Sequence, residues 1–345
     1  MPPRISTDLE RDLFAAALDL RRAEPWRYLT NIHYLLVAEP AGGRRALAVL
    51  GNARQQYGLQ TYAASCAAIF LAFVEEMPRM ELASPTIFYE LIEAVEVEFT
   101  AKGNLDKEDS ARASRCGYRP APRTPHAWPR FRAFRPNRFP WHIDESHARL
   151  LLADLRRALR WAELAPTLPW SDLGRPVALR QLPVVAEELP TDQPWTTADL
   201  AWERLAQPTV PAVPVLTLDS TRAAGWRVHP LDPKLEVIVD ERAPLIRIRD
   251  EAGGAPYFPR VGLCLDNRTQ MIMGQKMGGA DEAYAWNALR ALEAAIVAMG
   301  KRPGLVIFIN PNLPTALAAW LHAGEMKAAL RTSTHALEEI WSYLY

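Results

Sequence analysis

The chain has 345 residues, of which 49% are hydrophobic and 23% charged, and its 40 basic side chains balance 40 acidic ones. This composition excludes an intrinsically disordered chain, which would have fewer apolar residues and a larger net charge. The zero net charge argues against a protein that coats nucleic acid with its whole surface, although it is compatible with a local basic patch. The length predicts about two domains of roughly 150 residues each.

The cysteines and the N-terminal residues bear on the compartment. Cys66, Cys116 and Cys264 are far apart and form no CxxC pair, which argues against a disulfide framework and a thiolate zinc site. The N-terminal residues lack the apolar core of a signal peptide, and the longest apolar run, Cys66–Val74, is too short to span a bilayer. We therefore expect free thiols, no membrane partner and a cytoplasmic location.

Residues 1–109 are predicted to form a small α+β module. Apolar residues recur at helical spacing from Asp8 to Arg22, and Thr7 is a suitable N-cap. The runs His33–Ala38 and Arg45–Leu50 flank Pro and Gly residues and predict a β-hairpin. The other predicted elements of this module are a strand over Tyr57–Ala63, a helix over Ser65–Glu76 and a strand over Phe88–Phe99.

Residues 110–143 differ in character from the rest of the chain. They contain eight Arg and six Pro, with aromatic residues between them and no acidic residue. So many prolines argue against a long regular element. The segment is predicted to be an extended connector that lies over a domain surface.

The arginines of this connector have two interpretations. Arginine fixes phosphates and aromatic rings stack on bases, which indicates a nucleic-acid surface. Acidic residues stand shortly upstream, however, and the charges of the chain balance, so intramolecular pairing is favoured. The candidate nucleic-acid contacts are Arg119, Arg123, Arg130, Arg132, Arg135 and Arg138, and the candidate acidic partners are Glu90, Glu93, Glu96 and Glu98.

Residues 144–225 are predicted to begin with a strong helix. Asp144 is a good N-cap for an amphipathic helix that ends near Leu164. A Pro-rich passage follows, with short strand-like runs at Pro176–Leu182 and Val213–Leu218.

The start of that helix also gathers four residues that could bind a metal, namely His142, Asp144, Glu145 and His147. Residues three or four apart face each other on a helix, whereas these histidines are five apart. Acidic residues at a helix N-terminus are favoured by the helix dipole. The sequence therefore favours a structural cap, and no metal site is predicted.

Residues 226–345 are predicted to form a mixed sheet with helices packed against it. The run Gly304–Ile309 is apolar throughout, which is typical of a strand buried on both faces. The runs Arg260–Leu265 and Gln270–Met277 predict a hairpin, with Gly304–Ile309 beside it as an interior strand. Further strands are expected at Leu235–Val239 and Pro244–Ile248, and helices at Glu282–Met299 (ended by Gly300), Pro314–Ala323 (N-cap Asn312) and His335–Leu344.

This last segment resembles the catalytic core of retroviral-type integrases and transposases, a branch of the ribonuclease H-like superfamily. Asp232 stands where the first catalytic Asp of that family would be, and Asp266, Arg268 and Gly274 match its hairpin pattern. The resemblance covers about residues 226–324. It implies a ribonuclease H-like fold and a nucleic-acid enzyme that uses Mg²⁺ or Mn²⁺. The candidate catalytic residues would be Asp232, Glu236 and Asp266.

The same segment departs from the family at the second carboxylate. Asn310 follows the strand where an Asp is expected, and an amide supplies one neutral oxygen and no charge. The third acid of the family would lie on a later helix, where Glu338 and Glu339 stand near the end of the chain. The resemblance therefore implies an integrase-like core that has lost its catalysis.

The whole chain is also similar to a family of uncharacterised bacterial two-module proteins that brings no established activity with it. The residues that carry this similarity are Pro25, Trp26, Gly51, Tyr57, Gly58, Leu59 and Tyr62, then Pro129, Phe131, Arg132, Pro136, Pro140, Trp141, Ile143, Asp144 and Glu145, and the run PRVGLCLDNRT at 259–269.

Two hypotheses of function follow. The first is a non-enzymatic binding or scaffolding protein, with a protein partner favoured over nucleic acid and no cofactor. The alternative is a metal-dependent enzyme that processes nucleic acid. Because the common nucleotide-binding and hydrolase motifs GxGxxG, GxxxxGK[ST], GxSxG and HExxH do not occur in the sequence, neither hypothesis involves them.

Overall fold

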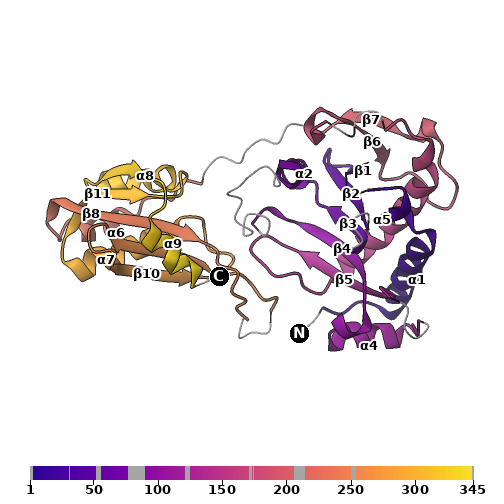
Figure 1. Ribbon diagram of the computed structural model, residues 1–345, viewed down its shortest axis with the longest axis horizontal. Helices are drawn as coiled ribbons and strands as arrows, with labels where there is room; N and C mark the ends of the chain where they lie inside the picture. The colour runs from indigo at the N-terminus through magenta and orange to yellow at the C-terminus, as the bar shows by residue number, and fades with distance from the viewer. Residues whose placement is uncertain are drawn as a thin grey trace. The chain divides into compact units, whose positions relative to one another are not determined.

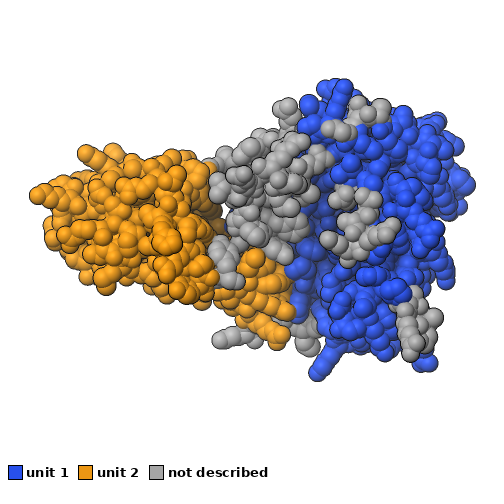
Figure 2. Space-filling view, in the orientation of Figure 1, with its two compact units in different colours: residues 1–136, 140–210 blue, residues 137–139, 211–345 orange. Residues whose placement is uncertain are grey.

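A computed structural model describes residues 3–30, 32–51, 56–76, 90–120, 125–170, 173, 175–205, 214–249 and 254–343. The chain divides into two compact units (Figures 1 and 2). Unit 1 comprises residues 1–136 and 140–210, and unit 2 comprises residues 137–139 and 211–345. The predicted segments 1–109, 110–143, 144–225 and 226–345 differ from this division, because most of the two middle segments packs into unit 1.

Unit 1 is built on a seven-stranded sheet in the order β5-β4-β3-β2-β1-β6-β7. Neighbouring strands are antiparallel except for β1 and β6, which are parallel. The strands are β1 (Tyr34–Ala38), β2 (Arg44–Leu50), β3 (Tyr57–Tyr62), β4 (Ala94–Thr100), β5 (Trp128–Phe134), β6 (Gln181–Ala186) and β7 (Ala201–Arg204).

Successive residues of a strand point to opposite faces of the sheet, and here the residues on each face are apolar. Helices therefore cover both faces. On one face Leu47 and Val97 share a core with Leu13 and Trp161 of α1 and α5, which lie side by side in Figure 1. On the other face α2 packs through Phe70. The helices are α1 (Thr7–Ala23), α2 (Ala67–Glu76), α4 (Lys107–Arg115) and α5 (Glu145–Leu164), with 3-10 turns at Pro25–Arg27, Lys102–Asn104, Ala165–Thr167, Val177–Leu179 and Thr197–Asp199.

Most predicted elements of unit 1 are confirmed. Strands β1 and β2 form the expected hairpin, and the Asp144 side chain caps α5 by accepting the N–H of His147. Three details were wrong. Helix α1 begins at Thr7 with Ser6 in the N-cap position, strand β4 begins at Ala94, and a 3-10 turn occupies residues 177–179 before β6. Residues 88–89 and 213 of the predicted strands lie outside the described residues, and residues 214–218 form no strand.

The predicted connector contains more regular structure than its prolines suggested. Helix α4 extends into it, and β5 runs along β4 from Trp128 to Phe134 despite Pro129. Strand β5 is the last in the sheet order. A proline is tolerated there because an edge strand has backbone N–H groups that need no partner strand.

Unit 2 is built on a five-stranded mixed sheet in the order β10-β9-β8-β11-β12. Strand β9 is antiparallel to both of its neighbours, β10 and β8, and β8, β11 and β12 are parallel. The strands are β8 (Leu231–Arg242), β9 (Arg260–Asp266), β10 (Ile272–Gly278), β11 (Arg302–Phe308) and β12 (Lys327–Leu330), and the helices are α6 (Ser220–Trp226), α7 (Trp286–Met299), α8 (Leu313–Ala323) and α9 (His335–Ser342).

The two faces of this sheet have separate cores. Val239, Cys264 and Phe308 pack with α7 and α8 on one face. Ile238 and Ile307 pack with Leu337 and Trp341 of α9 on the other. Residues 137–139 also belong to this unit, where Phe139 stacks on Phe258 with ring centroids 3.9 Å apart.

The predicted hairpin and the interior strand of unit 2 are confirmed, with two corrections. Strand β8 lies between the hairpin and β11, so β11 is not the neighbour of the hairpin. Residues 244–248 form no strand, only an isolated bridge from Ile248 to Tyr257. The order strand, hairpin, helix, strand, helix is the one the integrase resemblance predicted, but this order alone does not assign the unit to that superfamily.

The cysteines and the lengths of the helices were also considered in the sequence. Cys66, Cys116 and Cys264 are free thiols, as predicted. Within the described residues, every helix is either too short or too polar to cross a lipid bilayer.

Candidate functional site

The carboxylates predicted as catalytic lie apart in unit 2. Asp266, at the end of β9, is the register partner of Val237, which is five residues beyond Asp232 on β8. The register of β8 against β11 shifts in this stretch, where the residues from Asp232 to Val237 lie beside only three steps of β11, from Pro303 to Val306. At ~3.3 Å per residue, Asp232 and Asp266 are therefore about 10 Å apart along the strand. Two carboxylates must lie within a few ångströms of one ion to share it, so these two do not form a common metal site.

Each of these carboxylates is instead held by local partners. Asp232 pairs with Lys301 at 3.1 Å. The backbone N–H of Lys234 is the main cause that lowers the pKa of Asp232, and the hydrogen bond from Lys301 is the second. Asp266 accepts both the N–H and the hydroxyl of Thr269, at 2.6 and 2.8 Å. Glu236 accepts the Asn267 side chain at 2.7 Å. All three therefore stabilise strand ends and the β9–β10 turn.

Sequence reasoning missed a carboxylate near the end of β8, Asp240. Strands β8 and β11 are parallel and pair Val239 with Phe308, so Asp240, the next residue of β8, and Asn310, which follows the end of β11, lie toward the same edge of the sheet. This edge, at the carboxyl ends of parallel strands, is where α/β sheets most often bind ligands. The available signal was the apolar run Leu235–Val239, which is followed directly by an acid.

Arg242 occupies the space between the acidic side chains at this edge. Its Nε lies 2.8 Å from Asp240, and its Nη atoms lie 3.0 and 2.6 Å from Glu338 of α9. Trp341 also donates its indole N–H to Asp240 at 3.1 Å. The guanidinium thus bridges two carboxylates that come from different elements.

The electrostatics of this group follow from burial and from that bridge. Burial raises the pKa of Asp240, although the nearby Arg242 charge opposes the shift. The hydrogen bonds from Arg242 lower the pKa of Glu338. A divalent ion held by both acids would compete with a permanent cation for the same oxygens. The arrangement is that of an ion-pair network.

The arginines predicted to contact nucleic acid are mostly engaged with acidic side chains. Arg130 pairs with Glu98 across the strands β4 and β5, as predicted. The other acidic partners differ from the expected ones: Arg132 binds Asp106 and Asp109, Arg135 approaches Asp144 at 3.5 Å, and Arg138 pairs with Asp281. Arg119 is exposed and has no ion pair among the described residues, and Arg123 lies outside them.

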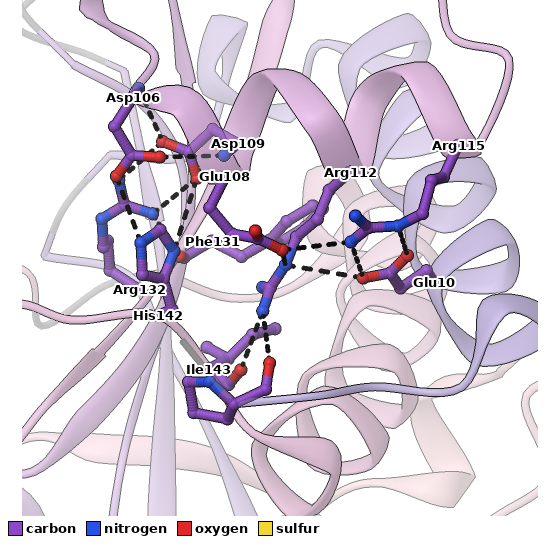
Figure 3. Close-up of polar contacts among 11 residues, drawn as sticks. Glu10, Asp106, Glu108, Asp109, Arg112, Arg115, Phe131, Arg132, His142 and Ile143 are labelled. Atoms are coloured by element: carbon purple, nitrogen blue, oxygen red, sulfur yellow. Dashed lines mark hydrogen bonds and ion pairs between the residues drawn. The ribbon is translucent and has the colours of Figure 1, made fainter. Parts of the chain in front are cut away.

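Arg132 belongs to a compact polar cluster at the start of α4 (Figure 3). Asp106 caps the helix by accepting the Asp109 N–H at 2.9 Å, and Asp109 accepts the Asp106 N–H in return. The buried His142 places Nε2 3.2 Å from Asp106 and Nδ1 3.8 Å from Asp109. Burial and the Arg132 charge lower the pKa of His142 in spite of both acids. Sequence reasoning missed this cluster because its members lie up to 36 residues apart.

A second group of charged side chains connects α4 to α1. Arg112 is buried and approaches Glu10 at 3.5 Å, and Arg115 binds the same carboxylate at 3.0 Å. Arg112 also donates to the carbonyl of Ile143 at 3.4 Å. Figure 3 shows these contacts as a second group along α4, separate from the group around Asp106 and Asp109. They join α1, α4 and the residues that precede α5.

Asp106, Asp109 and His142 have the donor atoms of a metal site, since these atoms all lie within 4.8 Å of one another. Carboxylate and imidazole together suit several transition metals. Arg132, however, binds both oxygens of Asp109 at 2.8 and 2.6 Å and Asp106 at 3.2 Å. A metal ion would meet this guanidinium at the same oxygens. The geometry therefore fits a structural ion-pair network better than a metal site.

Comparisons with known families give two matches, and the division between the two units, after residue 210, falls between them. Residues 11–169 match a Domain of unknown function (DUF7309), and residues 232–345 match a second Domain of unknown function (DUF6930). The chain is a protein of the uncharacterised two-module family. The comparison with curated proteins gives no match.

The first domain of this two-module protein contains a buried acid whose titration can be tested. Glu96 of β4 is 4% exposed and accepts only the Gln56 side chain, at 3.1 Å, among the hydrogen bonds of the described residues. Burial, with the Glu98 charge, raises its pKa from 4.5 to about 8, although Arg130 and Arg132 lie near. The folded state thus favours the protonated form of Glu96.

We expect the protein to lose stability from Glu96 as the pH rises. Because the folded state binds the Glu96 proton more tightly than the unfolded state, protonation of Glu96 contributes to the free energy of unfolding. This contribution is complete below pH 4.5 and is lost as the pH rises to about 8. Glu96→Gln, which stays neutral, should therefore become more stable than the wild type by up to ~1.4 kcal/mol per pH unit across this range. Urea unfolding at pH 5, 6.5 and 8 measures the difference, with the exposed Glu188→Gln as control. Parallel pH profiles of Glu96→Gln and the wild type would contradict the assignment.

Proposed function

We propose that this two-module protein is a non-enzymatic binding protein whose partner is another protein, and that unit 2 is a catalytically degenerate, integrase-like module. The observation that carries the proposal is the Arg242 bridge between Asp240 and Glu338, at the edge of the sheet where Asn310 follows β11. At this edge a nuclease needs carboxylates that are free to hold Mg²⁺ or Mn²⁺ against a phosphate. Here a fixed cation replaces the ion and an amide replaces one acid.

The charges of unit 1 and of residues 137–139 support a protein partner over nucleic acid. Binding to nucleic acid depends on Lys and Arg that can neutralise phosphates. Arg130, Arg132, Arg135 and Arg138 are paired with acids of the chain itself, so their charges are already neutralised. Such a surface is better suited to contacts with another protein than to a polyanion.

The alternative is a metal-dependent enzyme that processes nucleic acid, for which the strand order of unit 2 is the favourable observation. The two proposals differ in one assay. Purified full-length protein, incubated with single- and double-stranded DNA and RNA and with Mg²⁺ or Mn²⁺, is expected to show no cleavage above a metal-free control. Asp232→Ala and Asp240→Asn serve as matched variants. Metal-dependent cleavage that either substitution abolishes would overturn the proposal.

A further inference from the structure

Strand β10 forms an open edge of the unit 2 sheet. It pairs with β9 on one side, and no other strand of the described residues pairs with its second side. Three apolar side chains at this edge are exposed, namely Met271 (64%), Ile272 (44%) and Met277 (63%). A free edge with apolar side chains is a template for an added strand, because its outward N–H and C=O groups lack partners.

Helix α7 lies directly against this edge. A Cβ atom on Gly274 of β10 would come within 2.1 Å of the Ala291 carbonyl oxygen, so strand and helix touch through their backbones. This close approach places the outer face of α7 beside the free edge. That face carries Ala294, the 68% exposed Val297 and Ala298.

An open groove of about 570 Å³ lies along this contact. Its lining combines the small apolar residues of α7 with the cations Arg222, Lys276 and Arg290 and the single anion Glu293. Arg222 binds Glu293 at 2.6 Å, and Arg290 binds Glu282 at 3.2 Å, whereas Lys276 has no ion pair among the described residues. The groove therefore has an excess of positive charge.

The charge of the groove discriminates between occupants. A second copy of β10 would bring its own Lys276 and an equally positive groove to the same edge, and such like-charge contacts are unfavourable. A lysine on an edge strand opposes self-pairing in this way. A strand with acidic side chains has the complementary charge, and its main chain supplies the N–H and C=O groups that nucleic acid cannot offer.

We propose that an extended, acidic segment of a partner protein binds between β10 and α7 and adds a sixth strand to the unit 2 sheet. Main-chain hydrogen bonds to β10 would provide affinity, and alternate side chains would enter the groove beside Val297 and Lys276. This inference rests on the proposed function and names its partner class. The segment carries apolar as well as acidic residues, because the groove is lined by apolar side chains and by cations.

A displayed library of random twelve-residue peptides, selected on immobilised full-length protein, tests the proposal. We expect enrichment of sequences that alternate acidic and β-branched or aromatic residues. The leading peptide, made synthetically, should bind at least about tenfold more weakly to Lys276→Glu and to Val297→Glu. Both positions are exposed, so neither change disturbs the core. Lys327→Glu on β12, the other edge strand, is the matched control and should bind like the wild type.

Amide exchange locates the bound peptide. Bound peptide should slow exchange in residues 271–278 and leave β12 unchanged. The inference is overturned if no sequence is enriched, if the enriched peptides are basic, if binding survives both substitutions, or if β10 gains no protection. Self-association lost in Lys276→Glu would assign the edge to a second copy instead. If no peptide binds and the protein also cleaves no nucleic acid, only the inference about the β10 edge is wrong. If the protein cleaves nucleic acid in a metal-dependent way, the proposed function is wrong.

Discussion

Replacing Asp154 with alanine is expected to lower the free energy of unfolding of unit 1 by about 3–5 kcal/mol. Asp154 lies on α5 with its side chain fully buried, and it accepts Arg45 Nη2 at 3.0 Å and Arg157 Nη1 at 2.8 Å. Both arginines are also buried. Alanine would leave two cations without their shared anion in a low-dielectric core, and water cannot replace it there.

A second acid beside Arg45 limits the expected loss in the free energy of unfolding. Glu187 binds its Nη1 at 3.0 Å, so part of the Arg45 charge remains compensated after the substitution. Asp154→Asn keeps the size and one acceptor oxygen but not the charge, and it should cost less than alanine. The order of stabilities, wild type above asparagine above alanine, distinguishes an electrostatic role from simple packing.

Urea unfolding followed by tryptophan fluorescence measures these losses, and amide exchange in β1 and β2 assigns them to unit 1. Asp19→Ala is the matched control. Asp19 pairs with Arg22 on the exposed surface of α1, at 2.9 Å, and surface pairs of this kind contribute at most ~1 kcal/mol. A loss below about 1 kcal/mol for Asp154→Ala would show that the network does not carry the stability assigned to it.

Gly262→Ala is expected to destabilise unit 2 by about 3 kcal/mol, at the upper end of what overpacking costs. A Cβ at this position of β9 would lie 2.1 Å from the Asn287 carbonyl oxygen and 2.2 Å from its carbon. Both are backbone atoms of α7, so no side-chain rotation relieves the clash. The helix would have to move away from the sheet and would open the core that contains Cys264 and Leu292.

Gly279→Ala provides the control for this prediction, because a Cβ there meets no atom within 4 Å. Thermal unfolding of both variants, with amide exchange in α7 and β9, should show a marked loss for Gly262→Ala and near-wild-type stability for Gly279→Ala. Equal stability of the two variants would mean that α7 does not rest on the backbone of β9.

The amino-acid sequence by itself determined the elements whose signals are local. The helix that Asp144 caps, the hairpin around Asn267 and the buried strand Gly304–Ile309 were all predictable. The reason is that apolar periodicity and capping residues report burial and backbone conformation within a few neighbours. The same signals predicted an α+β unit at the N-terminus and a mixed sheet with helices in residues 226–345. They failed at β5, where an edge position made Pro129 acceptable in a strand.

Only the tertiary structure decided which charged residues meet. Asp232 and Asp266 were predicted as partners, but the register of β8 and β9 keeps them apart, and Asp240 meets Glu338 through Arg242 instead. Likewise, Asp109 and His142 come together only because α4 and the residues before α5 pack beside the same strand. Sequence spacing carries no information on such pairs, since the partner of a buried charge is chosen by strand register and helix packing across distant segments.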